Sequence, residues 1–80
     1  MHVAVEMSLY PLTGDFVPPI LDFIQRLKAW PGLTVVTNSM STQLSGDYER
    51  VFDALRAEVR PSLAGPHRAV MVIKVLGGGD

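Results

Sequence analysis

The order in which two hydrophobic periodicities follow one another is the feature that most constrains the fold of this chain. Residues 2–10 alternate between apolar and mixed side chains, and a period of two is typical of a half-buried strand. Apolar residues then recur at helical spacing, at Ile20, Phe23, Ile24, Leu27 and Trp30. Residues 33–38 and 41–45 again predict strands. A second helical stripe runs from Val51 to Val59, and residues 67–76 form a last apolar strand.

Aspartate and proline residues are expected to set the helix boundaries. Asp15 and Asp47 each precede a helical stripe and are expected to cap the helix that follows. The first helix should begin near Pro19, because the residue before a proline disfavours the helical region of φ and ψ. Pro61 should close the second helix and leave residues 62–66 as a loop.

The predicted order of elements is β-α-β-β-α-β, the split pattern of the ferredoxin-like fold. We therefore expect an α+β domain with a four-stranded antiparallel sheet and two helices on one face. Eighty residues suffice for one domain only. This domain should cover residues 1–76, and residues 77–80, with three consecutive glycines, should form a flexible tail.

The last predicted strand is mostly apolar on both faces, as in a strand that is buried on both sides. Its two sides carry Ala69, Met71, Ile73 and Val75, and Val70, Val72, Lys74 and Leu76. In the first strand, by contrast, one face holds Val3, Val5, Met7 and Leu9 and the other is mixed. Since contiguous exposed apolar surface usually marks an interface, we expect the helix-free sheet face to pack against another subunit in a sheet-on-sheet or edge-joined homo-oligomer.

Charge and composition exclude several classes of partner. The formal charge of −1 provides no electrostatic footprint for nucleic acid or an acidic membrane. Residues 41–45 contain no aromatic side chain on which RNA bases could stack. The absence of cysteine excludes a disulfide, a thiolate nucleophile, copper carriage by a thiol and a Cys-based metal site. With no signal segment recognised, this composition favours a cytoplasmic location.

Two segments of the chain resemble a known family. They are residues 8–12, Ser-Leu-Tyr-Pro-Leu, and residues 40–47, Met-Ser-Thr-Gln-Leu-Ser-Gly-Asp, and residues 51–55 continue the similarity. The family is the thiamin/hydroxymethylpyrimidine-binding (YkoF-type) family, together with its single-module thiamine-binding-protein-like relatives. The chain departs from the family pattern at the proline pair 18–19 and in the loop at 62–66.

This resemblance implies the same ferredoxin-like fold, a pocket for thiamin or its hydroxymethylpyrimidine moiety, and assembly into dimers or tetramers. Some members carry two modules in tandem, so a homo-oligomer would supply the second module here. We therefore expect a non-catalytic binding protein that acts in carriage, storage or sensing. No cofactor is expected to be required, and thiamin or hydroxymethylpyrimidine is the candidate ligand.

Polar residues on the first and third predicted strands suit such a ligand. An aminopyrimidine ring presents nitrogen acceptors and an amine donor, so its pocket needs a carboxylate or carbonyl, hydroxyl or amide donors and apolar walls. Glu6 and Ser8 share one face of the first strand, and Ser41 and Gln43 share one face of the third. These strands are neighbours in the predicted sheet, so the four groups should converge on its open face, with Tyr10 at the edge.

Two further candidates place the pocket differently. Thr42 faces the helices and is able to line a pocket between sheet and helices, and Ser39 is a donor at the strand connection. The sequence leaves both locations for the pocket open. The same hydroxyl and amide groups would be equally satisfied by water or by bonds across the sheet.

Two other functions stay open at this stage. Subunits of this fold also form cofactor-free enzymes of the dimeric α+β barrel type, an analogy at the level of the fold. The chain offers no cysteine, no histidine paired with an acid and no nucleophile elbow to support that alternative. The other alternative is a structural oligomer without a ligand.

Overall fold

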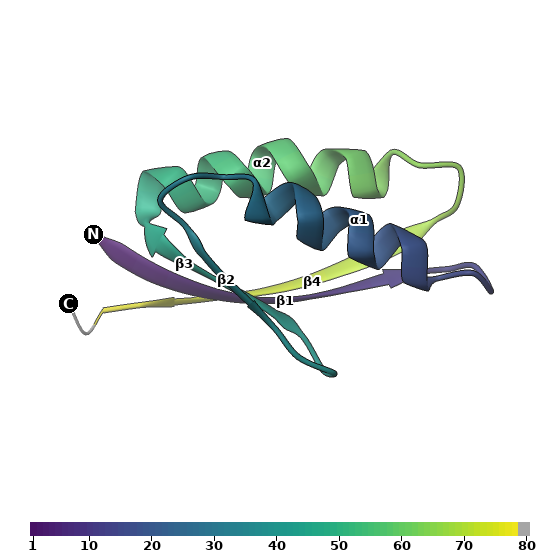
Figure 1. Ribbon diagram of the computed structural model, residues 1–80, viewed down its shortest axis with the longest axis horizontal. Coiled ribbons are helices and arrows are strands. Elements are labelled where there is room, and N and C mark those ends of the chain that lie inside the picture. Colours follow the sequence, from purple (N-terminus) through teal and green to yellow (C-terminus); the bar gives the residue numbers. More distant parts are fainter. Residues whose placement is uncertain (79–80) are drawn as a thin grey trace.

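The computed structural model describes residues 1–78 of the chain, and its elements follow the predicted order (Figure 1). The strands are β1 (His2–Pro11), β2 (Thr34–Thr37), β3 (Thr42–Asp47) and β4 (Ala69–Gly77), and the helices are α1 (Val17–Lys28) and α2 (Tyr48–Leu63). The strands form one antiparallel sheet in the order β2-β3-β1-β4. Both helices cover the same face of this sheet (Figure 1). The α+β ferredoxin-like fold expected from the sequence is confirmed.

The core lies between the sheet and the two helices, as the apolar periodicities of the strands and helices predicted. The alternate residues Val3, Val5, Met7 and Leu9 of β1 are buried. The helices cover them with Phe23, Ile24 and Leu27 from α1 and Val51, Ala54 and Leu55 from α2. Every second residue of β1 points the other way, and of these Glu6 and Tyr10 are exposed. The period of two is therefore the direct cause of a two-layer molecule with one open sheet face.

The helix termini differ from the sequence-based expectation. Helix α1 begins at Val17, before Pro19, because prolines in a first turn lack only amides that have no helical partner. Its N-cap is Phe16, so the prediction that Asp15 caps it is wrong. Asp47 does occupy the N-cap of α2, but its side chain makes no capping hydrogen bond.

Helix α2 continues past the proline that was expected to close it. It runs to Leu63, so the predicted end at Pro61 is wrong and the loop after it is shorter than residues 62–66. Pro61 lies in the last turn, where its missing amide removes a single helical bond. The turn is completed by the amide of Ala64, which donates to the carbonyl of Arg60 at 2.9 Å.

The strand ends also shift slightly. Strand β3 extends to Asp47, two positions beyond its predicted end, and β4 takes in Gly77 from the predicted tail. Residues 79–80 of that tail lie outside the described residues. Among residues 1–78, neither helix is long and apolar enough to cross a membrane.

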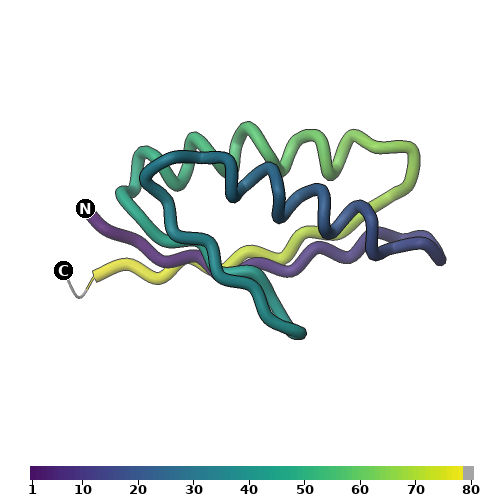
Figure 2. Tube along the Cα trace, viewed as in Figure 1, coloured from purple at the N-terminus to yellow at the C-terminus, as the bar shows by residue number. Residues whose placement is uncertain are grey.

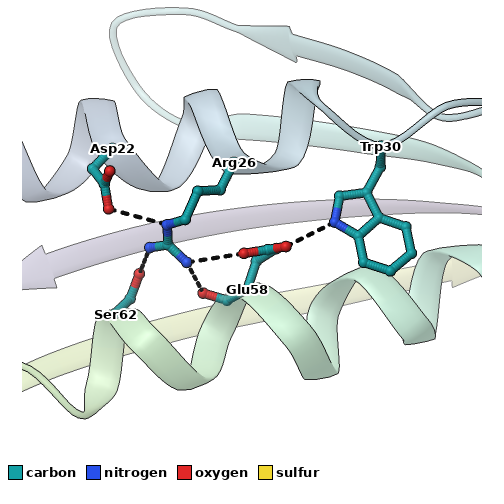
Figure 3. Close-up of polar contacts among 5 residues, drawn as sticks. All are labelled: Asp22, Arg26, Trp30, Glu58 and Ser62. Atoms are coloured by element: carbon teal, nitrogen blue, oxygen red, sulfur yellow. Dashed lines mark hydrogen bonds and ion pairs between the residues drawn. The ribbon is translucent and has the colours of Figure 1, made fainter.

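A polar cluster joins the two helices above the sheet (Figure 3). The Arg26 guanidinium donates from Nε to Asp22 at 3.0 Å, from Nη1 to the Glu58 carbonyl at 2.7 Å and Oε1 at 3.1 Å, and from Nη2 to Ser62 at 2.8 Å. Trp30 donates from Nε1 to the other Glu58 carboxylate oxygen at 2.8 Å. Because these partly buried groups satisfy one another, the cluster holds α1 against α2 rather than offering a ligand site.

Candidate functional site

A hollow of about 570 Å³ opens between α1, the end of β1 and the β2–β3 hairpin. Helix α1 supplies its apolar wall, from Val17, Ile20, Leu21, Phe23 and Ile24. The strands and the hairpin supply polar groups, from Ser8, Tyr10, Asn38, Ser39, Ser41 and Thr42. An apolar wall facing a small number of polar groups is the usual composition of a small-molecule site.

The hollow exists because the pairing between β1 and β3 ends before β1 itself ends. Their pairing ends where Met7 lies opposite Thr42, although β1 continues to Pro11 beside β4. The tip of the β2–β3 hairpin bends away from the helices (Figure 2). Residues from both faces of β1, Leu9 and Tyr10 among them, therefore line the same hollow. The two locations that the sequence left open for a pocket are thus connected at this point of the sheet.

The hairpin tip is held by its own asparagine. The Asn38 Oδ1 atom accepts hydrogen bonds from the amides of Met40, at 2.8 Å, and Ser41, at 3.0 Å. The Asn38 amide also donates to the Ser41 carbonyl at 3.1 Å. Side-chain acceptors of this kind fix tight turns in place of a glycine. The turn therefore places Ser39 and Met40 on the lining of the hollow in a fixed conformation.

Two threonine hydroxyls lie side by side on the lining, on β2 and β3. Thr42 is 6% exposed and is the one buried polar residue in the described part of the chain. Its Oγ1 lies 3.3 Å from Oγ1 of Thr37, directly opposite in the sheet register. A mutual bond uses one hydrogen and one lone pair, so the pair keeps one donor and several acceptor positions for another molecule. A ring that both donates and accepts hydrogen bonds would match this pair.

A second hollow, of about 510 Å³, lies on the open face of the sheet and includes Glu6 and Gln43. The Glu6 carboxylate is already engaged on both sides. Its Oε2 accepts from the Ser41 hydroxyl at 3.3 Å, and its Oε1 lies 3.5 Å from Nζ of Lys74. Glu6, Gln43 and Lys74 share one register row across three strands.

The predicted binding residues are therefore divided between two places. The hollow beside α1 takes in Ser8, Tyr10, Ser39, Ser41 and Thr42. The open-face hollow takes in Glu6 and Gln43. Ser41 connects the two sets, since it lines the first hollow and donates to Glu6 of the second.

Sequence reasoning missed five polar residues of these hollows: Thr34, Thr37, Asn38, Ser45 and Lys74. The alternation of the last strand already placed Lys74 on the open face, but only the register of β1 against β4 puts it opposite Glu6. Thr37 and Asn38 stand immediately before the predicted turn, and an asparagine at a tight connection is a recognisable turn signal. Among residues 1–78, no cluster of three histidine or acidic side chains is arranged to hold a metal ion.

The sequence and structure of the chain were compared with those of known proteins. The model of the YKOF-related family matches residues 2–75, which include all of the helices and nearly all of the strands. The chain belongs to the YKOF-related family. The resemblance seen in the hairpin segment is thereby confirmed. None of the curated proteins matches the chain.

Solved structures of the same fold come from several organisms. A hypothetical protein from Methanocaldococcus jannascii is 27% identical, with a TM-score of 0.83, over 99% of this chain and 82% of that one. A protein from Thermotoga maritima, provisionally named for thiamine biosynthesis/salvage, is 19% identical, with a TM-score of 0.85, over 98% and 85% of the two chains. A domain of unknown function from Bacillus cereus is 17% identical, with a TM-score of 0.79, over 98% and 77%.

Proposed function

We propose that this protein is a non-catalytic binding protein for thiamin or its hydroxymethylpyrimidine moiety, and that the hollow beside α1 is the binding site. The observation that carries the proposal is the Thr37–Thr42 hydroxyl pair facing an apolar helix wall across the hollow. A volume of about 570 Å³ falls within the range of small-molecule sites. Membership of the YKOF-related family and the name of the Thermotoga maritima protein support the same ligand class.

The roles of the polar residues follow from their geometry. The Thr37–Thr42 pair would meet the donor and acceptor edge of the pyrimidine ring. Val17 and Leu21 of α1, which line the opposite wall and are exposed, supply apolar surface against which the ring would pack. Glu6 would not contact the ligand directly. It accepts the Ser41 hydroxyl hydrogen at 3.3 Å, which would leave the lone pairs of the Ser41 oxygen for the ligand.

The chemistry of the lining supports binding without turnover. The described residues that line this hollow include no acid, histidine, lysine or arginine, and Tyr10 is the one titratable side chain among them, so a general acid–base pair lacks a second member. A lining without formal charge suits a neutral pyrimidine ring. We propose that the protein requires no cofactor and that it acts in the cytoplasm in carriage, storage or sensing of its ligand.

We also propose that copies assemble through the open face of the sheet, as a dimer or tetramer. Val70, Val72 and Leu76 are exposed on this face, opposite Tyr10, Ser8 and Ala4 of β1. Exposed apolar residues in contiguous positions are typical of a surface that another protein covers.

Titration calorimetry with thiamin and with hydroxymethylpyrimidine tests the binding site. We expect saturable binding of at least one of them, weakened by up to about tenfold in Thr42→Val, since one neutral hydrogen bond contributes about 0.5–1.5 kcal/mol. Valine keeps the shape of threonine and removes only the hydroxyl. Amino acids serve as ligand controls.

Thr34→Val is the matched control for this titration. Thr34 lies on β2, the strand paired with β3, but it faces the open side of the sheet and does not line the hollow beside α1. Its substitution should leave the affinity unchanged. Absence of heat with both ligands, from protein with a cooperative thermal transition, would contradict the proposed ligand class. Equal affinity of wild type and Thr42→Val would contradict the proposed site.

A further inference from the structure

Met40 is the most exposed of the large apolar residues in the described part of the chain, at 86%. It stands at the tip of the β2–β3 hairpin, between the end of β2 at Thr37 and the start of β3 at Thr42. Tight turns favour glycine, asparagine, aspartate, proline and serine, so the turn itself gives no reason for a methionine. Because single exposed apolar residues are common on protein surfaces, the neighbours of Met40 decide whether its exposure has a function.

Three other exposed apolar residues line the same hollow as Met40. Tyr10 comes from the end of β1, and Val17 and Leu21 come from the first two turns of α1. Each of the three is about half exposed. The four side chains therefore gather around one hollow from three separate elements of the fold. A small ligand in that hollow would cover all of them at once, as apolar linings of small-molecule sites do.

The backbone beneath Met40 is held in place, whereas its side chain is free to rotate. The Asn38 Oδ1 atom fixes the turn by accepting hydrogen bonds from the amides of Met40 and Ser41. A methionine side chain is unbranched and has three rotatable bonds, so it adapts to irregular gaps. Since so little of Met40 is covered, few contacts restrict that rotation. The side chain can therefore swing over the hollow without any movement of the hairpin.

We propose that Met40 closes the hollow over the bound ring, and that oxidation of its sulfur to the sulfoxide opens the site again. The role of Met40 rests on the proposed function, because the ring is that of thiamin or hydroxymethylpyrimidine. The edge of the ring meets the Thr37–Thr42 hydroxyl pair, and its faces lie between Met40 and the apolar wall of Val17 and Leu21. A thioether against an aromatic ring makes a favourable contact in addition to burying apolar surface.

Hydrogen peroxide is the oxidant in this step. The thioether sulfur attacks one peroxide oxygen, so a sulfur–oxygen bond forms while the oxygen–oxygen bond breaks. The second oxygen takes the proton of the first and leaves as water, so sulfur loses two electrons and peroxide gains them. The product is a polar, chiral sulfoxide in place of an apolar thioether. Closed over the ring, the sulfoxide oxygen would lose its hydration without a hydrogen-bond donor in the apolar wall, so the closed position is disfavoured.

The other three methionines of the chain provide internal standards for this reaction. Met7 is 1% exposed in the core and Met71 is partly buried, so both should react slowly in the folded protein. Met1 is 73% exposed but does not line the hollow beside α1. Peroxide should therefore modify both Met1 and Met40 in the free protein. Bound ligand should protect Met40 and leave Met1 unprotected.

Peptide mass spectrometry after mild peroxide treatment, with and without saturating hydroxymethylpyrimidine or thiamin, measures this protection. After removal of peroxide, calorimetry with the same two ligands should show an affinity about three- to tenfold weaker for the oxidised protein, because the contact of sulfur with the ring is lost. Met40→Leu is the matched control, since leucine keeps an apolar cover without an oxidisable sulfur. It should bind as wild type does both before and after peroxide, although Met1 is still oxidised. Met40→Gln, which is polar like the sulfoxide, should bind as weakly as the oxidised wild type.

Equal protection of Met1 and Met40 by ligand, or unchanged affinity of the oxidised wild type, would overturn the role of Met40. So would an equal loss of affinity in Met40→Leu after peroxide, because another residue would then be responsible. Circular dichroism of each sample distinguishes a loss of binding from a loss of folded structure. If untreated protein binds neither ligand, the proposed function and the closure by Met40 both fail. Binding that is insensitive to the oxidation of Met40 leaves the proposed function intact and overturns the closure alone.

Discussion

Leu27→Ala is expected to lower the free energy of unfolding by about 3–5 kcal/mol, the largest effect of any substitution considered for this chain. Leu27 is completely buried, at 0% exposure, in the cluster that α1 forms with β1 and α2. Removing its branched end leaves a cavity that neighbouring residues fill only in part, so lost contacts add to the lost transfer free energy. A domain of this length has a total stability of about 4–12 kcal/mol, so the variant should be close to unfolding.

Leu21→Ala provides the matched control. Leu21 belongs to the same helix and loses the same atoms, but it is 55% exposed, so we expect a loss below about 1 kcal/mol. Urea unfolding followed by circular dichroism measures both variants. A single protein concentration is needed throughout, because the proposed assembly would add to apparent stability. Equal losses in the two variants would contradict the packing of α1 described here.

The periodicity of the sequence was sufficient to predict the layers of the fold. Alternation in β1 separates a buried face from an exposed one, and this choice follows from side-chain geometry alone. The apolar stripes of α1 and α2 have one partner surface of the right size, the buried face of the sheet. Leu27 and Val51, taken from those stripes, are among the least exposed residues of the protein. Local pattern and tertiary packing agree here, so sequence reasoning succeeds.

The same reasoning failed at helix ends, where several weak preferences compete. Asp15 and Asp47 have good capping side chains, yet neither accepts a hydrogen bond from a helix amide. A capping bond contributes only about 1 kcal/mol, so the packing of the flanking strand and loop can override it. Pro61 was predicted to end α2, but in the last turn it removes a single helical bond, and the Ala64 amide still closes that turn on the Arg60 carbonyl.

The candidate site depends on a feature that no periodicity encodes. Its residue types were visible in the sequence, and Thr42 faces the helices as alternation requires. The hollow itself arises because pairing between β1 and β3 stops after Met7, which is a property of register and twist. The contact between Glu6 and Lys74 likewise requires knowledge of which β4 residue lies opposite each β1 residue.

Gly46→Ala is expected to lower the free energy of unfolding by about 2–4 kcal/mol, the second largest effect. Gly46 has a φ of +158°, a backbone conformation that side chains disfavour. A Cβ atom built there would lie 2.6 Å from Cδ2 of Leu33 and 3.4 Å from the Gly32 carbonyl oxygen. Leu33 packs against the core, so it can relieve the overlap only by disturbing its neighbours.

Gly65→Ala separates this strain from the general effect of replacing glycine. No atom lies within 4 Å of a Cβ built at Gly65, and its φ is not positive. Since alanine restricts the unfolded chain more than glycine does, Gly65→Ala should be neutral or stabilising by up to about 1 kcal/mol. Thermal unfolding of the two variants should therefore move in opposite directions from wild type. If Gly46→Ala is as stable as Gly65→Ala, the close approach of β3 to the loop before β2 is not part of the folded state.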